Sequence, residues 1–130
     1  MARDCGAAKV FNSMSIKDDE LVPASGTVVI SGAAPAYSLA FKITAMHGTI
    51  VAIGLPRGEI PVSVSVMSRK DLTLVANNQG SKNELAECLE LAVTHGVKPF
   101  YQMREFDQLN EGIKDIMAGK VDGRLVYKMD

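Results

Sequence analysis

Three short runs of apolar and β-branched residues constrain this chain more than any other feature of its sequence. They are 27–30 (Thr-Val-Val-Ile), 49–53 (Thr-Ile-Val-Ala-Ile) and 72–75 (Leu-Thr-Leu-Val). None of them alternates with polar residues, which is typical of strands covered on both faces, and such strands occur mostly in parallel sheets. Because parallel strands need long crossovers, usually helices, the sequence predicts an α/β fold.

Two helices are expected beside these strands. Between the first two runs, Pro35 suits a first helical turn, and apolar residues recur at helical spacing to Ile43 before Gly48 ends the segment. After the third run, Ser81 and Glu84 have capping-box spacing. The apolar stripe of this second helix comprises Leu85, Leu89, Ala92 and Val93. His47 and His95 each precede a glycine, so both are expected to cap helix ends.

The last third of the chain predicts a strand, a helix and a second strand. The strands are expected at 100–106 and 124–128. The helix should begin at Asp107 as N-cap and end at Gly119, with Gly112 weakening its middle.

Two segments fit this pattern less well. Residues 61–67 alternate like a half-buried strand although a helix is expected there, so we expect extended chain followed by a turn. At the start, residues 1–4 are expected to form the last turn of a helix that Gly6 ends, before a short strand at 9–11.

Composition excludes several classes of protein. The chain carries 14 basic and 15 acidic residues without a basic cluster, which argues against a nucleic-acid partner. The longest uncharged run, 21–41, contains two prolines and two glycines, which argues against a membrane helix. The first residues lack the pattern of a secretion signal, so a cytoplasmic location is expected. Cys5 and Cys88 stand alone and are expected to be free thiols.

Ligands of open α/β sheets bind at the carboxyl ends of the strands, which makes the segments after each run candidate sites. Small or amide residues follow all three runs, at 31–33, 54–56 and 76–80. They suit close approach of a ligand, and equally they suit ordinary turns. The Gly-x-Gly-x-x-Gly fingerprint of dinucleotide sites is absent from these 130 residues.

The stretches at 47–56, 72–75 with 80–82, 96–99 and 117–126 together resemble one enzyme family. They are similar to the end of the coenzyme domain and the C-terminal tail of zinc-containing medium-chain alcohol dehydrogenases, particularly the microbial type. The resemblance implies a partial Rossmann-like parallel sheet with flanking helices, plus a C-terminal strand-helix-strand tail. It also implies a partial nucleotide-binding domain at 1–98 and a tail at 99–130 that returns to the catalytic domain.

The same resemblance implies where a coenzyme would lie. Residues 31–33 would face the adenosine, 53–55 the nicotinamide, and 77–78 its carboxamide. The sequence Asn-Asn-Gln at 77–79 departs from the small and aromatic residues common there. Arg124 matches an arginine that grips the pyrophosphate, a role suited to a bidentate guanidinium. The implied coenzyme-binding residues are Ser31, Gly32, Ala33, Ile53, Gly54, Leu55, Asn77, Asn78 and Arg124.

The family's zinc ligands, Gly-rich turn and ribose-binding acid match nothing in this sequence. We therefore expect no zinc in this chain, weak NAD(P) binding at most, and no alcohol dehydrogenase activity from it alone. A homodimer or another oligomer, such as a swapped assembly, is expected through the edge of the sheet, since the strand matching 72–76 pairs with its symmetry mate in the family. Two alternatives stay open: a non-catalytic interaction module that uses an exposed sheet edge for a protein partner, and a longer enzyme of which this is one part.

Overall fold

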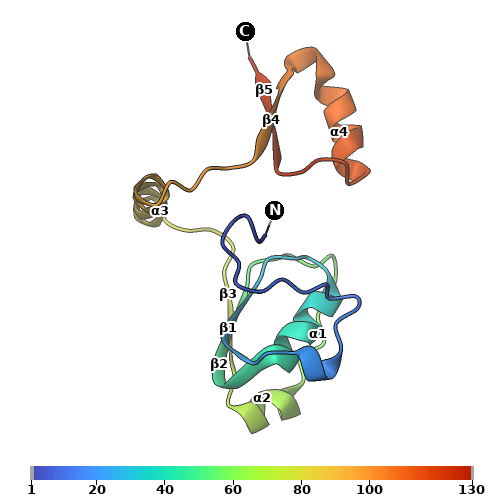
Figure 1. The fold of residues 1–130 in the computed structure, drawn as a ribbon, viewed down its shortest axis with the longest axis vertical. Helices are drawn as coiled ribbons and strands as arrows, with labels where there is room; N and C mark the ends of the chain where they lie inside the picture. Colours follow the sequence, from blue (N-terminus) through green and yellow to red (C-terminus); the bar gives the residue numbers. More distant parts are fainter. Residues whose placement is uncertain (1, 130) are drawn as a thin grey trace. The chain divides into compact units, whose positions relative to one another are not determined.

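The computed structural model describes residues 2–129, and the chain forms two compact units, the first ending at Gln79 and the second beginning at Gly80 (Figure 1). The first unit contains η1 (Asp18–Glu20), β1 (Ala24–Val29), α1 (Ala34–Ile43), β2 (Thr44–Ala52), α2 (Val64–Lys70) and β3 (Thr73–Ala76). The second contains α3 (Lys82–Thr94), β4 (Tyr101–Glu105), η2 (Phe106–Gln108), α4 (Leu109–Met117) and β5 (Arg124–Lys128).

The predicted fold class is confirmed: parallel sheets with flanking helices build both units. The first compact unit ends at residue 79, whereas the resemblance implies a domain division after residue 98. The two boundaries are 19 residues apart (98 − 79). The structural division separates two groups of residues that pack among themselves. The division after residue 98 concerns domain function and stays a prediction.

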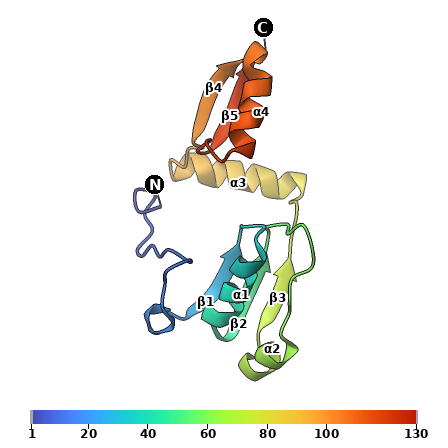
Figure 2. The same ribbon diagram turned by 90° about the vertical axis from the view of Figure 1, so that its right-hand side faces the viewer.

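The first unit is a three-stranded parallel sheet in the order β1-β2-β3, with α1 packed on one face (Figure 2). Paired residues form rows across the three strands, and alternate rows point to opposite faces. The row that contains Ile50, fully buried, faces α1, where Tyr37 and Phe41 complete the core. Burial of these side chains against the sheet is the main source of stability in this unit.

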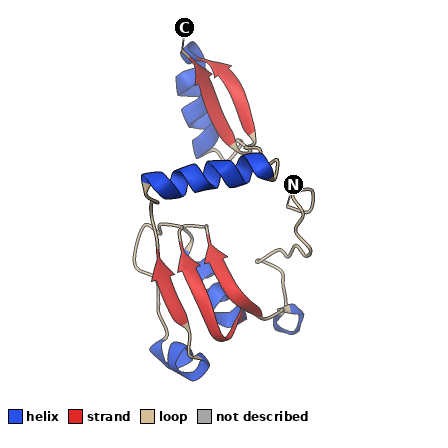
Figure 3. Cartoon of the chain, turned by 90° about the vertical axis from the view of Figure 1, so that its left-hand side faces the viewer, coloured by secondary structure: helices blue, strands red, loops and turns tan. Residues whose placement is uncertain are grey.

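The opposite face of the sheet carries no helix of the first unit (Figure 3). Its central row is Val28, Val51 and Val75, and the first and last of these are 56% and 46% exposed. The sequence predicted strands covered on both faces, and within the described part of this unit that prediction is wrong. The apolar character of the row fits a covered sheet, but the unit supplies helices to one side alone.

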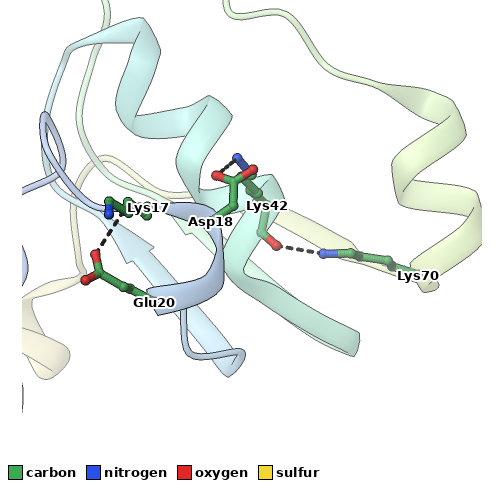
Figure 4. A network of polar contacts seen from close by, with 5 residues as sticks. All are labelled: Lys17, Asp18, Glu20, Lys42 and Lys70. Atoms are coloured by element: carbon green, nitrogen blue, oxygen red, sulfur yellow. Dashed lines mark hydrogen bonds and ion pairs between the residues drawn. The ribbon is translucent and has the colours of Figure 1, made fainter.

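Polar contacts at the C-terminal end of α1 connect this helix with β2 and α2, and Figure 4 shows the contact between Lys70 and Lys42. The Lys70 ammonium, on α2, donates hydrogen bonds to the carbonyls of Phe41, Lys42 and Thr44 at 3.1, 2.9 and 2.8 Å. The buried Thr44 hydroxyl donates to the Ala40 carbonyl at 2.6 Å. The last turn of a helix leaves carbonyls without partners inside the helix, and a cation there also interacts favourably with the helix dipole.

The start of β2 differs from the prediction. The chain enters the strand directly after α1, at Thr44, and not after Gly48. Ala24 and Gly26 of β1, two residues apart, pair with Thr44 and Thr49 of β2, which are five residues apart. The extra residues of β2, between positions 44 and 49, therefore form a bulge. His47 takes a left-handed conformation there (φ 58°), and its Nδ1 lies 3.0 Å from the carboxylate of Asp71. The expectation that His47 caps a helix is therefore wrong.

The segment predicted as extended chain and a turn contains a helix, α2. Ser63 is its N-cap, and its hydroxyl accepts a hydrogen bond from the Val66 backbone N–H at 3.4 Å. Val66 and Met67 pack against the core, whereas Val64 is 75% exposed. The period-two pattern misled because two of its three valines, Val62 and Val64, are exposed and only Val66 reaches the core.

The N-terminal expectations also change. Described residues 2–6 form turns that end at Gly6 (φ 91°), while residue 1 of the predicted helical turn lies outside the described part. Residues 9–11 do not form a strand.

In the second unit α3 begins and ends as predicted. Ser81 and Glu84 form the capping box, and the two hydrogen bonds with Ser81 hold the pKa of the Glu84 carboxyl below its usual value. His95 is the C-cap, and Gly96 follows at φ 65°. The apolar stripe finds no core in this unit, since Leu89, at its centre, is 58% exposed.

The strand-helix-strand tail is confirmed, with β4 and β5 paired in parallel. The helix α4 starts at Leu109, because the predicted N-cap, Asp107, lies in η2. Gly112 is buried, and a Cβ atom built on it would lie 1.7 Å from the Tyr127 hydroxyl oxygen. This glycine, predicted to weaken the helix, makes the space in which Tyr127 packs.

Replacing Lys70 by methionine should lower the free energy of unfolding by about 2 kcal/mol, because three carbonyls lose a charged donor. Urea unfolding followed by circular dichroism measures the loss. Arg69→Met, one residue earlier on α2, is the control and should change it by less than about 0.5 kcal/mol. Equal losses in the two variants would contradict this account.

Gly112→Ala separates helix propensity from packing. Propensity alone would stabilise α4 by about 1 kcal/mol, whereas the overlap with Tyr127 should destabilise the unit by about 1–3 kcal/mol. Thermal unfolding should detect this loss of stability in Gly112→Ala. The control Asn110→Ala, at an exposed position on α4, should show no such loss. Adding Tyr127→Phe should recover part of the loss, since it removes the overlapping oxygen, and no recovery would sink the packing explanation.

Candidate functional site

The ends of β1 and β2 meet so closely that two glycines are required. The backbone N–H of Gly54 donates to the Val29 carbonyl at 2.8 Å. A Cβ atom on Gly54 would lie 2.3 Å from the Ser31 carbonyl oxygen, and one on Gly32 would lie 2.6 Å from that of Leu55. The predicted segments 31–33 and 53–55 are thus neighbours, and contact between backbones explains their glycines.

A cavity of about 600 Å³ opens where β2 and β3 end. Four predicted residues line it: Gly54, Leu55, Asn77 and Asn78. The backbone N–H of Asn77 donates to the Ala52 carbonyl at 3.0 Å, which extends the pairing of the strands up to the cavity. The register of two parallel strands therefore brings together residues that are more than twenty positions apart in the sequence.

Tyr37 is one of the lining residues that sequence reasoning missed as part of this site. Its side chain is 1% exposed, and its hydroxyl donates a hydrogen bond to the Gly54 carbonyl. The helix α1 starts just beyond β1 and carries Tyr37 in its first turn, under the end of β2. The position of Tyr37 on a helix could be predicted from the sequence, but its partner Gly54, just after β2, could not. Glu59 and Ile60 also line the cavity, from the loop after β2.

The remaining predicted residues lie elsewhere. Ser31 and Ala33 line a second cavity of about 450 Å³ between β1, α1 and residues 13–14, and the Ala33 N–H donates to the Ser31 hydroxyl at 3.2 Å. Ile53 is 42% exposed. Arg124 is the exposed first residue of β5, in the second compact unit, where its backbone N–H donates to the Phe100 carbonyl at 2.9 Å.

Other kinds of site find little support among residues 2–129. No group of three or more His, Cys, Asp and Glu side chains there is arranged to hold a metal ion. Cys5 and Cys88 are free and exposed, as predicted. In the described part of the chain no helix has the length and apolar character needed to cross a membrane.

Comparisons with known proteins point to one family. No protein-family profile matches the chain. Its sequence is 23% identical over 99% of its length to an alcohol dehydrogenase of Geobacillus stearothermophilus, and 29% identical over 82% to one of Moraxella sp.. The chain spans 40% and 32% of the length of these two relatives.

Solved structures share the fold. An alcohol dehydrogenase from the archaeon Aeropyrum pernix matches 95% of the chain at 15% identity, with a TM-score of 0.83 over 38% of its own length. Acetophenone reductase from Geotrichum candidum, solved in complex with NAD, matches 98% at 22% identity, with a TM-score of 0.86 over 37% of its length. The resemblance that the sequence showed is confirmed: this chain is similar, over most of its length, to part of the alcohol dehydrogenases.

Proposed function

We propose that this chain contributes the nicotinamide side of a dinucleotide site, and that the 130 residues alone bind NAD(P) weakly and do not oxidise alcohols. The observation that carries the proposal is the cavity at the ends of β2 and β3, lined by the backbone of Gly54 and by Asn77 and Asn78. The relatives named alcohol dehydrogenases, and the NAD complex of a reductase with this fold, support it.

The chemistry of the cavity suits a carboxamide. Asparagine side chains offer both donors and acceptors, so Asn77 and Asn78 can pair with an amide in either sense. Gly54 contributes backbone alone to the cavity, because the Ser31 backbone fills the space that a side chain would take. Tyr37, by holding the Gly54 carbonyl, fixes the backbone at that point. A bidentate contact from Arg124, in the second compact unit, to the pyrophosphate stays the expectation that the resemblance implies.

Zinc chemistry is not part of the proposal for this chain. The described residues offer no ligand cluster that fits the metal, so no step is assigned to it. We propose the division of labour that the resemblance implies: residues 1–98 form the partial nucleotide-binding domain, and 99–130 form the tail that returns to the catalytic domain. A cytoplasmic location belongs to the same proposal.

A second candidate function is an interaction module, and the free edges of the sheet favour it. The sheet ends in β1 on one side and β3 on the other, and neither outer edge pairs with another strand among residues 2–129. An unpaired edge is a template for strand addition. We propose a homodimer through β3, with another protein as the alternative occupant.

Isothermal titration calorimetry with NADH tests the first candidate. Saturable heat is expected, and Asn78→Leu should weaken binding by about threefold to tenfold, because it removes hydrogen bonds to the ligand. Asn83→Leu on α3, outside the cavity, should leave binding unchanged. Absence of saturable heat from the unaltered chain would reject the proposal and favour the interaction module.

Analytical ultracentrifugation tests the edge. The chain should sediment as a dimer at micromolar concentration, and Val75→Lys should shift it to monomer, because a charged residue on an edge strand opposes pairing. The control is Val93→Lys on α3, where the valine is 83% exposed. It also replaces valine by lysine, but away from the edge strand β3, so this variant should remain a dimer. A monomeric unaltered chain would count against the edge as an interface.

A further inference from the structure

A groove between α1 and α2 belongs to neither candidate function. Its volume is about 640 Å³, and it shares no lining residue with the cavity at the strand ends. The residues that line it are Ser38, Phe41, Lys42, Pro61, Val62, Ser63, Val66, Arg69 and Lys70. All of them belong to the first compact unit.

The groove is apolar inside and polar at its sides. Phe41, 6% exposed, and Val66 join it to the core of the unit, and Pro61 and Val62 extend the apolar surface. A pocket with apolar walls and a few polar groups is the usual form of a small-molecule site, and this volume falls within the usual range.

The charge of the groove is one-sided. Lys42, Arg69 and Lys70 line it, and none of its nine lining residues is acidic, although the whole chain has a net charge of −1. Lys70 is held by three carbonyls, and Lys42 pairs with Asp18 of η1. Arg69 forms no ion pair within residues 2–129, so its guanidinium is the cation available to a ligand.

We propose that this groove binds an apolar organic monoanion, such as a carboxylate with an aliphatic or aromatic body. The body packs against Phe41 and Val66, and the anionic group meets the Arg69 guanidinium, whose fork of N–H donors matches a carboxylate. Ser38 also lines the groove, and its hydroxyl can donate a further hydrogen bond to the anion. The uniform sign of the charge selects an anion over a neutral molecule of the same shape.

Fluorescence titration of the full chain with 8-anilinonaphthalene-1-sulfonate, an apolar anion, tests this site. Arg69→Gln should raise the dissociation constant about fivefold, the effect of one exposed charge pair. Lys9→Gln, at an exposed position outside the groove, makes the same change of net charge and should have no effect. Equal dissociation constants for these two variants would overturn the proposal.

Two further measurements keep the test specific. Val62→Glu places a carboxylate in the groove at a side chain already 41% exposed and should abolish binding, with circular dichroism confirming the fold. Octanoate should displace the dye at lower concentration than 1-octanol does. If dye binding survives Arg69→Gln and Val62→Glu but is lost in Val28→Ser, the dye binds the open face of the sheet and the proposal is overturned. Equal displacement of the dye by octanoate and by 1-octanol would also overturn it.

Discussion

The carbonyl groups at the C-terminal end of α1 fix how the elements of the first unit are arranged around its apolar core. Thr44 and Lys70 satisfy them from β2 and from α2, two elements that are far from each other in the sequence. The Thr44 hydroxyl also lies 2.8 Å from that of Thr27, so β1 joins the same group of contacts. Because Thr44 is fully buried, an unpaired oxygen there would be costly, and the four elements are bound to one arrangement.

That arrangement decides what the opposite end of the sheet can present. With β2 fixed between β1 and β3, the carboxyl ends of all three strands reach the same edge. The glycines at 32 and 54 then serve backbone packing, while Asn77 and Asn78 remain free to line a cavity. At the carboxyl ends of the strands, the glycines thus have a structural role and the asparagines face the cavity. The strand ends carry the proposed nicotinamide contact, and the groove between the helices lies apart from it.

Sequence reasoning recovered part of the candidate site and missed a part for physical reasons. Gly54, Leu55, Asn77 and Asn78 were found because they directly follow apolar runs, and strand ends are where parallel sheets bind ligands. Tyr37 was missed because its role depends on a carbonyl seventeen residues later, a contact that only the packing of α1 on β2 creates. Ser31 and Ala33 were grouped with the others, yet the structure places them at a separate cavity, since α1 lies between the two.

The sequence by itself determined the strands of the three apolar runs, the helix with the capping box, the parallel pairing and the strand-helix-strand tail, because apolar runs and caps act over a few residues. Tertiary structure alone decided the rest. The helix α2 forms where alternation suggested a strand, because Ser63 caps it and the core receives Val66. Gly112 proved to be a packing requirement, because Tyr127 fills the space beside it. One face of the sheet stays open in this unit. The apolar pattern of a strand shows that both of its faces can be covered, but it does not show which element covers each face.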